Sequence, residues 1–122
     1  MTSQGTAQGR FQRAIQRRHL LAAEMAVREM DYVSLPNALA LTLLIGEESP
    51  GRYERAAGRW HAPFVFEAKG IGLAESQLAL AALAALVGPG AEAAAATLAQ
   101  LARTFGAIGI EAVLGTRSPS TP

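Results

Sequence analysis

The chain of 122 residues contains no cysteine, and only 6% of its residues are aromatic. The lack of cysteine excludes disulfides, thiolate zinc sites and cysteine nucleophiles. β-branched residues are sparse and no long period-2 alternation of apolar residues occurs, which argues against a sheet. Half of the residues are nevertheless hydrophobic, so the core must be built mainly from leucine and alanine, whose modest size favours close packing between helices.

Strong net charge and a membrane-spanning run are also lacking. The formal net charge of +1 is too small to indicate a polyanionic partner by itself. No apolar run reaches the roughly 20 residues that a transmembrane helix needs, so we expect no membrane partner. Charged residues soon interrupt the apolar residues after Arg17-Arg18, which is unlike a signal peptide. We therefore expect a cytoplasmic protein.

The most prominent feature that is present is residues 77–87, a stretch of leucine and alanine with no charge and no polar face. Such a composition predicts a helix, here from about residue 73 to residue 87. A helix that is apolar on every side belongs in a protein interior. A second apolar segment, residues 38–45, follows Ser34 as an expected N-cap and Pro36 in the first turn.

Three further helices are predicted around these two. One spans residues 10–30, with a face formed by Phe11, Ile15, Ala22 and Ala26 that Leu21 and Met25 join. Another begins at Ser49-Pro50 and carries an aromatic stripe, although Pro63 should kink or end it; the stripe consists of Tyr53, Ala56, Ala57, Trp60 and Phe64. The last covers residues 91–105 and ends at Gly106, a left-handed C-cap.

The sequence therefore predicts an all-α, single-domain bundle of about five helices around two apolar central segments, residues 39–45 and 78–87. The bundle should occupy residues 10–115. Residues 1–9 and 116–122 are small, polar and rich in glycine, serine or proline, and we expect them to be a disordered arm and tail.

Arginines recur at helical spacing in two places. One set lies on the first predicted helix and the other on the third, opposite its aromatic stripe: Arg10, Arg13 and Arg17, then Arg52, Arg55 and Arg59. Glu48 stands four residues before Arg52 in the favourable orientation for an ion pair, whereas Arg55 and Arg59 repel each other at the same spacing. Each set is either an ordinary solvated helix face or a surface for an acidic partner or for phosphates.

Motifs for catalysis, cofactors and metals are missing. The sequence has no nucleophile elbow and no phosphate-binding loop. Its two histidines, His19 and His61, form no i,i+4 pair or Glu-x-x-His motif that would present two metal ligands from one helix. We therefore predict no catalytic residues, no cofactor and no metal site, and a non-enzymatic protein.

The segment from Pro50 to His61, followed by residues 72–83, resembles small uncharacterised all-helical proteins of high-GC actinobacteria. The resemblance covers roughly residues 20–108, and its most distinctive runs are Arg52-Tyr-Glu-Arg-Ala-Ala57 and Arg59-Trp-His61. No activity is established for such proteins. The resemblance implies a bacterial source and a cytoplasmic setting, and it transfers no functional residue.

Our leading hypothesis is a protein-interaction or regulatory module that binds its partner through the two arginine sets. The two apolar helices are either covered fully by the flanking helices or share part of their surface with a second copy; we expect the second arrangement, a homodimer. An alternative is a nucleic-acid-associated accessory protein that uses the basic N-terminal helix. A third is a small enzyme or ligand carrier with an apolar pocket near Trp60.

Overall fold

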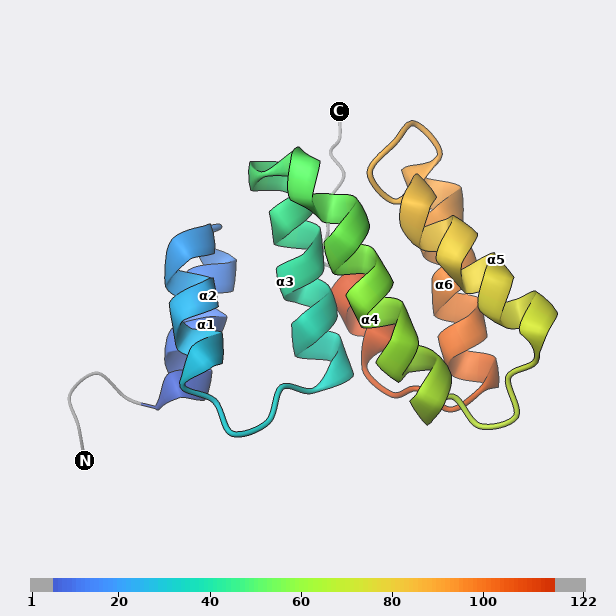
Figure 1. Ribbon diagram of the computed structural model, residues 1–122, viewed down its shortest axis with the longest axis horizontal. Coiled ribbons are helices and arrows are strands. Elements are labelled where there is room, and N and C mark those ends of the chain that lie inside the picture. The colour runs from blue at the N-terminus through green and yellow to red at the C-terminus, as the bar shows by residue number, and fades with distance from the viewer. Residues whose placement is uncertain (1–5, 116–122) are drawn as a thin grey trace.

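The computed structural model describes residues 6–115, which form an all-α fold (Figure 1). Within these residues there are seven α-helices rather than five, and no strand. In chain order the elements are α1 (Ala7–Gln16), α2 (Leu20–Arg28), α3 (Leu35–Glu48), the 3₁₀ turn η1 (Pro50–Arg52), α4 (Tyr53–Glu67), α5 (Leu73–Ala85), α6 (Ala91–Thr104) and α7 (Ile110–Gly115). None of the described helices is long and apolar enough to cross a membrane.

The expected single helix over residues 10–30 is wrong, because the chain turns back after Gln16 and forms an α1–α2 hairpin. Arg18 adopts the left-handed conformation with φ of 56°. The amide of His19 donates to the carbonyl of Ala14 at 2.9 Å, and the amide of Arg18 donates to that of Ile15 at 3.1 Å. These two bonds close α1 in a Schellman motif. The hairpin also leaves Leu21 and Met25 exposed, although the sequence placed them on the apolar face.

The centre of the bundle is formed by α3 and α4. The predicted aromatic stripe of α4 is confirmed, since all five of its residues are buried. Trp60 is 2% exposed and donates its indole N–H to the carbonyl of Leu35 at 2.9 Å, while its ring stacks on Phe64 with centroids 5.0 Å apart. Pro63 does not end the helix, which continues to Glu67. Ser34 caps α3 as predicted, by accepting a hydrogen bond from the amide of Asn37.

The apolar helix α5 is not central, contrary to expectation. It lies at the far end of the molecule from the hairpin, beside α6 (Figure 1). Only one side of it is covered: Ala79, Ala82 and Leu83 are buried. Its other sides expose large apolar residues, namely Leu73, Leu78, Leu80 and, just beyond its end, Val87. The uncharged stretch from residue 77 onward is compatible with burial on every side, but the fold supplies too few neighbours to bury it.

The last two helices close the bundle. α6 ends as predicted at Gly106, where φ is 79° and the amide of Ala107 donates to the carbonyl of Ala102 at 2.8 Å. Gly109, with φ of 90°, directly precedes the short helix α7, which packs against α3 and α6. A Cβ at Gly109 would stand 2.7 Å from Pro36, so glycine is required there for close approach as well as for backbone conformation.

Two separate hydrophobic cores result, and α3 contributes to both. Leu39 and Leu43 belong to the main core with α4 to α7, whereas Leu44 joins a smaller core with Phe11 and the alanines of the hairpin. The apolar contacts between the hairpin and the rest of the bundle are therefore made through α3. The helical part of the chain begins at Ala7, inside the expected arm 1–9; residues 1–5 and the expected tail 116–122 lie outside the described residues.

Candidate functional site

The arginines predicted on α4 do gather around one hollow. Arg52, Arg55 and Arg59 line a depression of about 450 Å³ together with Gly51 and Glu54. The three occupy the solvent side of η1 and α4 because the aromatic stripe takes up the opposite side. Within the part of the chain that the structure describes, neither Arg55 nor Arg59 forms an ion pair. Their two positive charges lie one helical turn apart.

Arg52 differs from its two neighbours because an acidic residue already compensates it. Its guanidinium donates to the carboxylate of Glu24 on α2, and not to that of Glu48 as the spacing predicted. The hydrogen bond to Glu24 raises the pKa of Arg52, and the negative charge of Glu24 raises it further. Arg52 ties the hairpin to the start of α4, so we assign it a structural role beside Arg55 and Arg59.

The N-terminal arginines line a second hollow, of about 300 Å³, between α1 and α2. Arg10, Arg13 and Arg17 meet there with His19 and Glu29. Arg10 pairs with Glu29 at 2.7 Å, and Arg18 pairs with Glu47 on α3 at 2.6 Å. Glu29, just after α2, and Glu47 on α3 thus neutralise part of the basic surface expected on the N-terminal helix.

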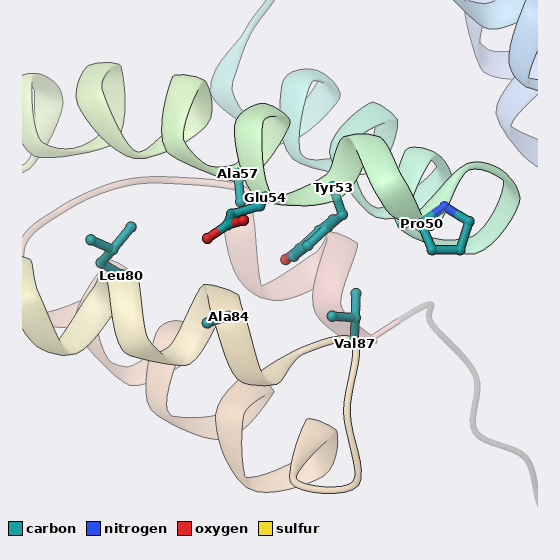
Figure 2. Close-up of a pocket in the computed structure, with 8 residues that line it drawn as sticks. Pro50, Tyr53, Glu54, Ala57, Leu80, Ala84 and Val87 are labelled. Atoms are coloured by element: carbon teal, nitrogen blue, oxygen red, sulfur yellow. The ribbon is translucent and has the colours of Figure 1, made fainter.

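An apolar groove lies between α4 and α5 (Figure 2), and no sequence pattern predicted it directly. Its volume is about 670 Å³. Pro50, Tyr53, Glu54 and Ala57 line it on one side; Leu80, Ala84 and Val87 line the other, with Gly46 at one end. Trp60 does not line the groove, although it is only one turn beyond Ala57 on the same helix. The groove is therefore not the pocket expected near Trp60; Tyr53 and Ala57 form its aromatic and aliphatic floor.

Two polar contacts hold the helices on either side of the groove. The hydroxyl of Tyr53 donates to the carbonyl of Leu83 at 2.6 Å. Nε2 of His61 lies 2.8 Å from the carbonyl oxygen of Ser76, so this nitrogen must carry the proton and donate it. Both contacts run from α4 to the backbone of α5, and they fix the spacing of the two helices.

One sequence signal could have indicated the groove. Leu73, Leu80 and Val87 recur seven residues apart, and Ala84 lies between the last two on the same side of α5. This is the spacing of a single helix face. The row was hidden by the leucines and alanines on every other side of the helix, which made all faces look alike.

The histidines have structural roles in the described chain. His19 caps α2, since its Nδ1 accepts a hydrogen bond from the amide of Ala22 at 3.2 Å. His61 links α4 to α5, as described above. Among residues 6–115, no three histidine or acidic side chains come together in a way that could hold a metal ion.

No family model matches the chain, and no match to it is found among the curated proteins or the solved structures.

Proposed function

We propose that the protein is a non-enzymatic, cytoplasmic interaction module that binds an acidic segment of a protein partner on the solvent face of α4. The residues that carry the contact are Arg55 and Arg59, with Arg52 at the edge of the same hollow. The second arginine hollow, lined by Arg10, Arg13 and Arg17, is an accessory surface of the same kind.

One observation carries this proposal: Arg55 and Arg59 lie one turn apart and form no ion pair among the described residues. Like charges at this spacing repel and lower helix stability slightly. The hollow between them is open to solvent, and a guanidinium presents a planar set of donors that matches a carboxylate. A carboxylate from a partner would relieve the repulsion and satisfy both side chains.

The test is affinity capture from a lysate of the source organism, with the full chain as bait. The double variant Arg55→Glu/Arg59→Glu should lose partners that the wild-type chain retains. The matched control is Arg28→Glu/Lys69→Glu, which changes the net charge by the same amount at two exposed basic residues that line neither arginine hollow. Circular dichroism should show unchanged helix content in both. If the α4 variant retains the same partners, or both variants lose them equally, the α4 surface is not the binding site.

The nucleic-acid alternative has weaker support, because Glu29 and Glu47 pair with Arg10 and Arg18. It remains testable by a salt titration of duplex DNA binding. Phosphate contacts release counterions, so a nucleic-acid role requires an affinity that falls steeply as the salt concentration rises. Absence of binding at about 50 mM salt would exclude this role.

A further inference from the structure

We infer that the groove between α4 and α5 is a binding site for a small amphiphile with an apolar body and a positively charged end, such as an alkylammonium ion. This site adjoins the arginine hollow: Glu54 lines both, but neither Arg55 nor Arg59 lines the groove.

The size and walls of the groove fit an apolar body. Its volume of about 670 Å³ lies within the range of roughly 300–1,000 Å³ that is typical of ligand pockets. Leu80 and Val87 on its α5 side are 44% and 51% exposed. The empty groove thus keeps aliphatic surface in contact with water, and a bound hydrocarbon would remove that contact.

The charge of the ligand follows from Glu54. It is the one charged residue that lines the groove, and its carboxylate projects from α4 into the space that faces Leu80 (Figure 2). Within the described residues, Glu54 has no ion-pair or hydrogen-bond partner. The neighbouring hydroxyl of Tyr53 already donates to Leu83. The groove therefore offers a negative acceptor at the edge of an aliphatic surface, which complements an ammonium group.

The same carboxylate argues against a second copy of this chain as the occupant. The exposed row of α5, from Leu80 to Val87, is uncharged. Packing that row into the groove of another molecule would cover Glu54 without giving it a partner, and burying an unpaired carboxylate is costly. A ligand with its own cation avoids that cost.

Three probes of equal chain length separate charge from hydrophobicity: decylammonium, 1-decanol and decanoate. Each is titrated at pH 7 into the ¹⁵N-labelled full chain, and the NMR shift changes give both the Kd and the location. We expect shifts at Leu80, Ala84 and Val87. We also expect decylammonium to bind about fivefold or more tightly than decanoate, as one partly exposed charge contact allows.

Two variants test the roles of the carboxylate and the wall. Glu54→Gln should bring the decylammonium-to-decanoate ratio close to one while 1-decanol binds as before. Ala84→Phe should weaken all three probes by filling the groove, and it should be tolerated because Ala84 is exposed. Ala96→Phe, at an exposed position of α6 outside the groove, is the matched control.

The inference is overturned by any of four results. They are no binding of any probe, equal binding of the three by the wild-type chain, shifts that map to another surface, or an unchanged ratio in the Glu54 variant. Sedimentation of the wild-type chain adds a fifth: a dimer that Ala84→Phe dissociates would show that a second copy fills the groove. Glu54→Gln also changes the arginine hollow, which Glu54 lines too, whereas Leu80, Ala84 and Val87 line the groove and not that hollow. The probe titrations and Ala84→Phe therefore test the groove separately from the proposed function.

Discussion

Replacing Trp60 with alanine should lower the free energy of unfolding by about 3–5 kcal/mol. The ring is 2% exposed, so almost all of the roughly 150–250 Å² that an aromatic side chain can bury is removed from water. At about 25 cal/mol per Å² this area corresponds to about 4–6 kcal/mol. Alanine retains the Cβ atom, and the residues around the cavity relax partly. The expected loss is therefore somewhat smaller, in the range that is typical of aromatic-to-alanine truncations.

The hydrogen bond from the indole to Leu35 separates a second variant from the first. Trp60→Phe keeps an aromatic ring to stack near Phe64 but loses the bond to the carbonyl of Leu35. A net hydrogen bond contributes about 0.5–1.5 kcal/mol, and the smaller ring adds a modest packing loss. We expect Trp60→Phe to cost about 1–3 kcal/mol, which leaves a folded protein even if the alanine variant is too unstable to study.

The assay is urea unfolding followed by far-UV circular dichroism, because the variants remove the lone tryptophan and with it the fluorescence signal. Phe66→Ala is the matched control: it truncates an aromatic residue on the same helix that is 90% exposed. It should change the unfolding free energy by less than about 0.5 kcal/mol. A loss below about 1 kcal/mol for Trp60→Ala, or an equal loss for Phe66→Ala, would refute the central position of the α4 stripe.

The remaining predictions concern the backbone and the two cores. Gly106→Ala should lower the unfolding free energy by about 1–2 kcal/mol, because alanine is disfavoured at positive φ although the added Cβ would meet no atom within 4 Å. Gly58 is equally unobstructed but lies inside α4, so Gly58→Ala should raise the unfolding free energy by about 0.5–1 kcal/mol. The same urea assay checks both variants, and changes of the same sign in the two would contradict the argument. Phe11→Ala should remove about 3–5 kcal/mol from the hairpin core alone, so hydrogen exchange should speed up in α1 and α2 and not in α4; uniform acceleration would instead mean one cooperative unit.

Local signals in the sequence were sufficient for some helix ends but not for all. Ser34 and Gly106 were predicted as caps, and both are confirmed because a cap depends on the few residues around it. The turn at Arg18 was missed for the opposite reason. Arginine has no preference for the left-handed region, so nothing in residues 16–19 marks a break. Tertiary contacts of the hairpin, through Phe11 and Leu44, must compensate the strain.

The candidate site was predicted only as far as helical periodicity reaches. Spacing placed Arg52, Arg55 and Arg59 on one face, and they do line one hollow. Spacing could not show which of them is already neutralised. Arg52 pairs with Glu24, a residue on another helix and 28 positions away, and such a pair depends on how the hairpin docks against α3. The division into one structural and two uncompensated arginines therefore emerged only from the fold.

The position of α5 shows why hydrophobicity alone did not identify the centre of the bundle. An apolar composition indicates that a helix tolerates burial on every side, but the number of neighbouring helices decides whether it is buried. The large rings of Trp60 and Phe64 need more contacts than leucine or alanine, so α3 packs against α4 and the two helices together form the centre of the bundle. α5 is then left with α4 and α6 as its neighbours. Its uncovered side forms the wall of the groove, so the same packing that buries Trp60 also creates the apolar surface that faces Glu54.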